Sequence, residues 1–404
     1  MMTFLLFNFI LNTISQISDS PYTLFGAGQI QDNGFGTNMG MGGTGIAFKS
    51  QRYLNNLNPA SYTGIDSLNF IFEFGCFGNV TRFESYNMSK RKTNGNIRYL
   101  ATGLKIWRWW AVSAGVIPYS SVGYRINSSE IVEGLNITTN KLYSGSGGIS
   151  QLYLGNAFLI DKHLSLGINI SYIFGKITQS EEVESKGTFN EYIVNNHYYM
   201  SNFHMDYGLQ YTLYINQMSY SLGIIFGNER KLNTRNEVVL ELDDDSVSLE
   251  KDDTRFYIPA KFGVGFSIAR TEIFKAGIDY EFNRWSQYKF SNALLNTRDS
   301  ERFAAGMEYC PRKSYRDRGL KMLNYRAGLN YKKTYLSIDH TPINSAAVSL
   351  GLGIPLKNIF SHINLSFEAG EYGTTKNKLI RERFYTLHAN FTLRDIWFEK
   401  VRYH

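Results

Sequence analysis

The feature that most constrains this chain is a two-residue alternation of apolar and polar side chains. Between residues 164 and 174, Leu, Ile, Tyr and Phe occupy every second position, and mostly small or polar residues lie between them. Successive side chains of a β-strand face opposite ways, so this pattern predicts a strand with one oily face and one polar face. No stretch has the sustained i, i+3, i+4 apolar spacing of bundle helices. The same alternation returns at 262–268, 274–282, 325–331, 363–369 and 385–393.

Three further features favour a membrane barrel over a soluble β-sandwich, which alternates in the same way. The oily faces often begin or end in Tyr or Phe, and the strands are long enough to cross a bilayer. Connections alternate between short turns and long polar stretches, as periplasmic turns and extracellular loops do. The predicted short turns are 160–163, 216–217, 269–272 and 355–360, and the predicted long connections are 127–147, 179–202, 231–254 and 373–382.

These observations predict an all-β fold, a transmembrane antiparallel β-barrel of about fourteen strands between Ser67 and Ile396. Fourteen strands enclose a lumen too wide for wall side chains alone to fill, so something must plug or line it. A soluble β-sandwich stays open as the alternative, and it predicts extraction from cells without detergent.

Composition and charge exclude several other classes of protein. A mean hydropathy of -0.27 does not fit a polytopic helical membrane protein, and 15% aromatic residues do not fit a disordered chain. The net charge is +7, but the 42 Lys and Arg residues are scattered rather than gathered. Such a distribution favours contact with anionic outer-membrane lipid and lipopolysaccharide over nucleic acid.

The N-terminus resembles a secretory signal. The run from Phe4 to Leu11 is almost wholly apolar and polar residues follow it, but it is too short to span a bilayer as a permanent helix. We therefore expect a signal peptide over residues 1–19 and localisation in the cell outer membrane; a buried first strand is the alternative.

Residues 20–66 do not alternate and are rich in glycine. The run Gly40-Met41-Gly42-Gly43-Thr44-Gly45 lacks the preceding strand and the Lys-Ser/Thr of a phosphate loop. We interpret the segment as irregular backbone packed inside the lumen, where water or wall side chains can satisfy its polar groups. The predicted domains are a signal peptide (1–19), a plug (20–66) and a barrel (67–404).

Few reactive side chains of the sequence lie in a pattern that predicts catalysis or metal binding. His204 and His388 share the parity of the lumen-facing residues, but no Ser lies at a distinctive spacing from them, and no H-E-x-x-H or C-x-x-C motif is present. Cys76 and Cys310 are predicted to be free thiols. The sequence therefore predicts no enzyme, no cofactor and no metal site.

Two motifs in the predicted plug resemble the FadL family of outer-membrane transporters. They are the stretch from Asn38 to Ala47, which reads NMGMGGTGIA, and Asn58-Pro59-Ala60-Ser61 just before the first strand. The segment 118–124 also resembles that family, with less weight. The resemblance implies an N-terminal hatch inside a fourteen-stranded barrel. The hatch residues it implies are Gly40, Gly42, Gly43, Asn58, Pro59, Ala60 and Ser61.

The resemblance implies uptake of small hydrophobic compounds, such as long-chain fatty acids or hydrocarbons, through a barrel gated by the hatch. In that mechanism Asn58 holds a bend by side-chain hydrogen bonds, Pro59 fixes φ, and the glycines let the backbone pass close to the wall. These residues could equally serve only to fold the plug. PorV-type relatives share the hatch motif, so a non-transporting barrel subunit of an outer-membrane secretion or assembly complex is the alternative. A transporter predicts an apolar pocket behind the hatch and a gap in the wall. A subunit predicts a sealed lumen and a conspicuous surface for a protein partner.

Overall fold

The fold is described from a computed structural model of the chain. It describes residues 20–31, 34–86, 88–132, 137–185, 192–242, 245–251, 256–270, 273–288, 295–311, 319–356 and 361–396. The predicted signal peptide lies outside these ranges. So do the acidic residues Asp243, Asp244, Asp252 and Asp253 of the predicted long connection 231–254.

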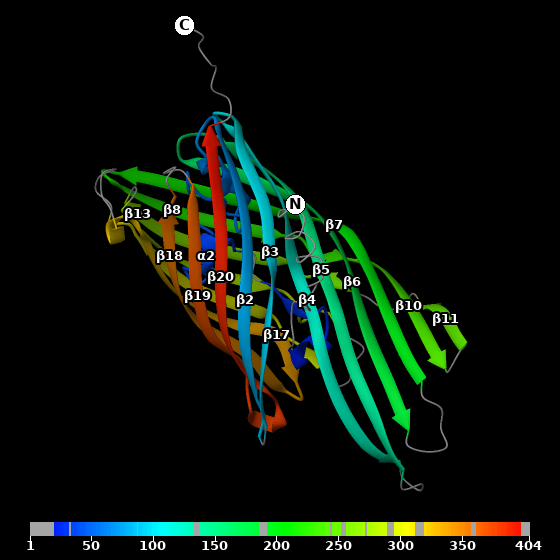
Figure 1. Cartoon of the computed structure of the whole chain (residues 1–404). Helices are drawn as coiled ribbons and strands as arrows, with labels where there is room; N and C mark the ends of the chain where they lie inside the picture. The colour runs from blue at the N-terminus through cyan, green and yellow to red at the C-terminus, as the bar shows by residue number, and fades with distance from the viewer. Residues whose placement is uncertain are drawn as a thin grey trace, which may run out of the picture.

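Fourteen antiparallel strands form a closed wall, which confirms the predicted fold class. Each wall strand pairs with its neighbours along the chain, and the last strand pairs with the first from Asn69↔Ile396 to Glu84↔Arg381. Figure 1 shows the cylinder, with the red β20 beside the blue β2. The wall strands are β2 (Asn69–Glu84), β3 (Ser89–Trp107), β4 (Trp110–Val132), β5 (Ile137–Leu159), β6 (Leu164–Ser185), β7 (Tyr192–Ile215), β8 (Met218–Gly227), β13 (Lys261–Arg270), β14 (Phe274–Asn283), β16 (Ser300–Tyr309), β17 (Asn324–Ile338), β18 (Thr341–Pro355), β19 (His362–Gly373) and β20 (Arg381–Ile396).

Short elements lie inside the wall or at its long-loop end, which is the end opposite the C-terminus of β20; η3, between β16 and β17, lies at the other end. No helix in the described part of the chain is long and apolar enough to cross a bilayer. The short elements are η1 (Pro21–Leu24), β1 (Gln29–Ile30), α2 (Gly36–Met39), η2 (Pro59–Gly64), β9 (Arg230–Lys231), β10 (Asn233–Leu242), β11 (Asp245–Lys251), β12 (Tyr257–Ile258), β15 (Leu295–Thr297), η3 (Gly319–Met322) and η4 (Lys376–Lys378).

The oily faces of the strands point outward. On β6, Leu166 and Tyr172 are about 40% exposed, whereas Ser165 and Ser171 on the opposite face are at most 1% exposed. Outward Leu, Ile and Phe side chains with inward Ser and Asn suit a wall that meets hydrocarbon outside and polar groups inside. At the short-turn end, Trp109 stacks on both Trp107 and Trp110, and this cluster of aromatic rings is typical of an interfacial girdle.

Three of the predicted long loops are wrong, because most of their residues are strand. Strands β4 to β7 are 22 to 24 residues long, well beyond the roughly 9–11 residues that cross a bilayer. Their outer halves leave the hydrocarbon region, so their outward faces become polar and the alternation that marked the strands disappears. Together with β10 and β11 they form a projecting sheet beyond the barrel, at the lower right of Figure 1.

Candidate functional site

The N-terminal segment lies within the barrel as two layers. The inner layer, residues 34–66, crosses the lumen: α2 contacts β18, β19 and β20, and η2 contacts β5, β6 and β7 on the other side. The outer layer, residues 20–31, lies towards the long-loop end, where Ser20 donates a hydrogen bond to Glu382 near the start of β20. The predicted hatch residues all belong to the inner layer.

Asn58 connects three parts of the structure and is fully buried. Its Nδ2 donates to the carbonyl oxygens of Ile46 at 2.8 Å and of Leu209 on β7 at 3.1 Å. Its Oδ1 accepts from the backbone N–H of Ala60 at 3.0 Å, which caps η2, and Pro59 occupies the first helical position. Ala60 is buried, and Ser61 donates to the Asn55 carbonyl at 2.7 Å. These contacts fold the bend, and Pro59 also lines the cavity described below.

The three predicted glycines lie where backbone meets wall. Gly42 has φ +65° and its N–H donates to Ser349 Oγ at 2.8 Å. Gly43 has φ +76°, and its carbonyl accepts from Arg302 at 3.1 Å. Gly40 lies in the turn that follows α2 and precedes Gly42 and Gly43. The left-handed conformation favours glycine at positions 42 and 43.

Sequence patterns did not identify the wall glycines that face the inner layer. A side chain at any of them would place its Cβ within 2.4 Å of a backbone atom of residues 41–60. In the sequence, each of these glycines is one more small residue on the polar face of its strand. Only their similar position along the barrel axis, in several strands at once, could have revealed them. They are Gly167 on β6, Gly223 on β8, Gly306 on β16 and Gly328 on β17.

Asp279 on β14 anchors the turn that follows the glycines. Its Oδ2 accepts from the backbone N–H groups of Gly45 at 2.6 Å and Ile46 at 2.9 Å. We expect Asp279→Ala to lower the free energy of unfolding by about 2 kcal/mol or more, because it leaves two buried donors without an acceptor. Urea unfolding in micelles measures this loss. Asp279→Asn keeps an oxygen and should lose less; equal losses would contradict the role of the two hydrogen bonds.

The outer layer closes the lumen towards the long-loop end. The Thr23 side chain bonds both the N–H and the carbonyl of Gly123 on β4. On the opposite wall, Tyr335 on β17 donates to the Gly28 carbonyl at 2.7 Å. Tyr22 donates to the Ile380 carbonyl, and because burial raises the pKa of Tyr22 to about 12, this hydroxyl stays protonated. The layer therefore bridges two sides of the barrel.

Strands β3 and β4 separate part-way along the wall. Their pairing ends at Leu100↔Val116, beyond which each strand pairs only with its other wall neighbour. Pro118 lies at this point and has no N–H to donate. Strand β1 pairs with the exposed edge of β4 at Ser120 and Ser121, and the Gln31 N–H donates to the Tyr119 carbonyl. The outer layer thus covers the edge that β3 leaves.

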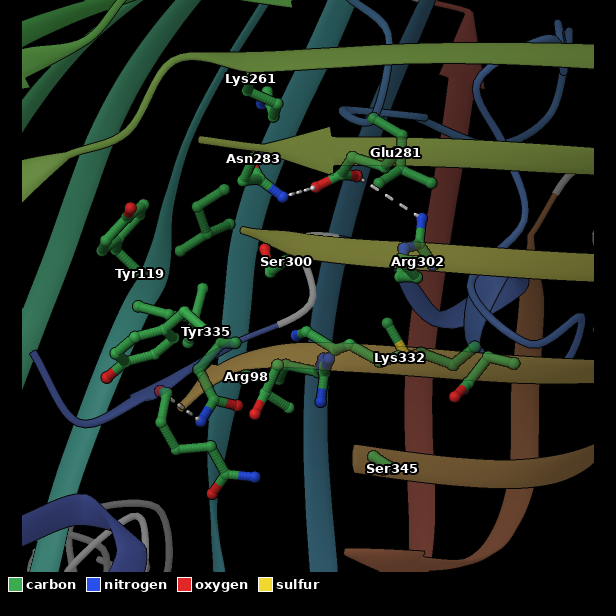
Figure 2. Close-up of a pocket in the computed structure, with 18 of the residues that line it drawn as sticks. Arg98, Tyr119, Lys261, Glu281, Asn283, Ser300, Arg302, Lys332, Tyr335 and Ser345 are labelled. Atoms are coloured by element: carbon green, nitrogen blue, oxygen red, sulfur yellow. Dashed lines mark hydrogen bonds and ion pairs between the residues drawn. The ribbon is translucent and has the colours of Figure 1, made fainter. Parts of the chain in front are cut away.

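A cavity of about 250 Å³ lies between the two layers. Both layers line it, and it reaches the separation of β3 and β4 through Arg98 and Tyr119. Figure 2 shows charged side chains converging on it, with Glu281 between Asn283 and Arg302. Polar side chains outnumber apolar ones in its lining. Its charged residues are Arg98, Asp206, Lys261, Glu281, Glu301, Arg302, Lys332, Glu368 and Glu382.

Ion pairs organise the lumen wall. Asp206 pairs with Lys261 at 2.8 Å and lies 3.4 Å from His204, while His388 lies 3.3 Å from Glu368. Among the described residues, neither histidine bonds to a Ser side chain. Within the described ranges, no group of three or more His, Cys, Asp or Glu side chains is arranged to hold a metal ion. The charged side chains can bind polar groups of a solute, while apolar side chains from both layers and the wall also line the cavity.

A second hollow lies on the outer face of the wall across β13, β14, β16 and β17. Its volume is about 550 Å³, and its lining includes Phe266, Ile278, Phe303 and Leu329. These side chains are all more than 40% exposed, so the hollow faces the hydrocarbon region and not the lumen.

The geometry defines a class: a fourteen-stranded barrel with a folded N-terminal segment inside it. Several solved structures are similar to this chain over nearly their whole length. The toluene transporter TbuX of Ralstonia pickettii is 15% identical over 90% of this chain and 99% of its own, with a TM-score of 0.59. A FadL homologue of Pseudomonas aeruginosa is 11% identical over 92% and 100%, with a TM-score of 0.59. The toluene transporter TodX of P. putida is 14% identical over 92% and 100%, with a TM-score of 0.58.

These likenesses confirm the FadL-type fold. A family model described as BamG matches residues 1–404, and the chain belongs to this BamG family. No curated protein matches the sequence.

Proposed function

We propose that this barrel is a non-transporting subunit of a larger outer-membrane complex that secretes or assembles other proteins. The observation that carries the proposal is the way the lumen is filled and lined. Two layers of the N-terminal segment cross it, and the cavity between them is lined mainly by polar and charged side chains. Transfer of an apolar solute into such a cavity gains less free energy than transfer into a wholly apolar pocket, because it also desolvates charged side chains. We propose that residues 20–66 act as a permanent plug and that residues 1–19 are a signal peptide.

The bonds between plug and wall favour a fixed structure. Asp279 and Arg302 on the wall bond the backbone of the inner layer, and Asn58 of the inner layer donates to the Leu209 carbonyl on β7; all three side chains are buried. Opening a passage would break several such bonds and leave buried groups unpaired. Each unpaired group costs about 1–3 kcal/mol of free energy. We propose that Gly40, Gly42, Gly43, Asn58, Pro59, Ala60 and Ser61 fold the plug rather than move as a gate.

Purification from native membranes tests the proposal. The tagged chain, extracted in mild detergent, should elute in stoichiometric complex with an outer-membrane secretion or assembly machine. Depletion of the chain should lower the amounts of other outer-membrane barrels or secreted proteins. A monomeric chain whose depletion leaves those proteins at normal levels would refute the subunit role.

Uptake of small hydrophobic compounds, such as fatty acids or hydrocarbons, is the second candidate. It is favoured by the separation of β3 and β4, which the cavity reaches, and by the fold shared with toluene transporters. In this reading the outer layer must leave the edge of β4 before a solute can pass. Outer-membrane lipid and lipopolysaccharide would surround the wall in either case.

A further inference from the structure

The projecting sheet ends in a strand that has no second neighbour among the described residues. Strand β7 pairs with β8 through Asp206–Ile215 and with β10 through Tyr192–Ser201. Strand β11 pairs with β10 from Asn236↔Lys251 to Leu242↔Asp245 and with no other described strand. Within the described ranges no strand pairs with the other backbone edge of β11, where a further strand can add.

One face of this edge is apolar and exposed. Val247 is 52% exposed and Leu249 is 66% exposed. They lie opposite Leu240 and Val238 on β10, so these four side chains share one face of the sheet. Leu240 in turn lies opposite Val194 on β7, which extends the apolar stripe across three strands. An extended segment with apolar side chains at every second position would continue this stripe.

The other face is acidic. Glu250 on β11 lies directly opposite Glu237 on β10, and like charges in that position destabilise a sheet. Arg235 pairs with Glu250 at 2.9 Å, but both side chains are more than half exposed, so the pair is screened and weak. Glu241 on β10, opposite Ser246, adds a third carboxylate to this face, in a chain whose net charge is +7.

We propose that β11 is a docking edge for a basic β-strand of a partner protein. The partner adds to the sheet through its backbone, places apolar side chains beside Val247 and Leu249, and presents Lys or Arg to the acidic face. Backbone pairing gives such contacts their affinity and the alternate side chains give them specificity. The inference rests on the proposed subunit role and names the chemistry of one partner.

Peptide binding to the purified full-length chain in micelles tests the docking edge. The probes are a short peptide in which Val alternates with Lys and its counterpart in which Val alternates with Glu. We expect the basic peptide to bind, with an affinity that falls as salt rises, and the acidic peptide not to bind. The double variant Val247→Lys/Leu249→Lys, which places charges on the apolar face, should weaken binding at least about tenfold.

The matched control is Ser246→Gln/Ser248→Gln, which places two polar side chains on the acidic face of the same strand and leaves its charge unchanged. It should retain most of the binding. Equal losses in the two double variants, or equal binding of the two peptides, would overturn the proposal. A dimer of the chain that dissociates in Val247→Lys/Leu249→Lys would also overturn it, because the occupant would then be a second copy. Peptide binding is measured on the isolated chain, so its failure leaves the depletion test of the subunit role unaffected.

Discussion

Gly328→Val should detach the inner layer from the wall. A Cβ at position 328 would lie 2.1 Å from the Met41 carbonyl carbon and 2.2 Å from the Gly42 nitrogen, and backbone atoms cannot rotate away as a side chain can. We expect a loss of about 3 kcal/mol in the free energy of unfolding, the upper range for overpacking. Urea unfolding in micelles measures the loss, and limited proteolysis should cleave residues 34–66 faster.

The matched control for this prediction is Gly78→Val. Gly78 is also a wall glycine, on β2, but no atom lies within 4 Å of the Cβ position there. Its unfolding curve should match that of the unchanged protein. If both variants unfold alike, close contact with the wall is not what holds the inner layer.

Glu308→Ala should destabilise the barrel more than any single surface change. Glu308 on β16 lies between Arg326 and Lys275, at 2.5 and 3.3 Å, and the Arg326 side chain has no exposed surface. Lys275 and Arg326 also lie over the Tyr53 ring of the inner layer. Removing the carboxylate leaves two buried cations without their partner, which costs about 3–5 kcal/mol.

Glu371→Gln provides the comparison. Glu371 pairs with Arg383 at 2.7 Å, but its side chain is 52% exposed, so the change should alter stability by less than about 1 kcal/mol. Thermal unfolding of both variants in the same detergent measures the difference. Similar shifts for Glu308→Ala and Glu371→Gln would show that the lumenal pairs are solvated and do not hold the plug.

Sequence patterns predicted the wall well where it meets hydrocarbon. Between residues 164 and 174 the environment differs sharply between the two faces, so side chains alternate. The pattern failed at 127–147, where β4 and β5 continue into water and both faces tolerate polar residues. Strand pairing there is a backbone property, which side-chain polarity does not report.

The interior was predicted only in part. The predicted hatch residues lie together in the inner layer, but Asp279 and the wall glycines were not identified as their partners. Those contacts join residues more than a hundred positions apart, and nothing in the local pattern marks them. The separation of β3 from β4 was also missed, although Pro118 inside an apparent strand was a usable signal.

Uptake by living cells tests the central claim, that the lumen carries no hydrophobic solute. A host strain lacking its own barrels for hydrophobic compounds would express this chain, with TbuX as the positive control for toluene. Labelled toluene and a labelled long-chain fatty acid should enter at the rate of the empty host, although the folded barrel is present in its membrane. Uptake above that rate, lost when Asn58 and Pro59 are replaced by Ala, would contradict the claim and establish a gated transporter.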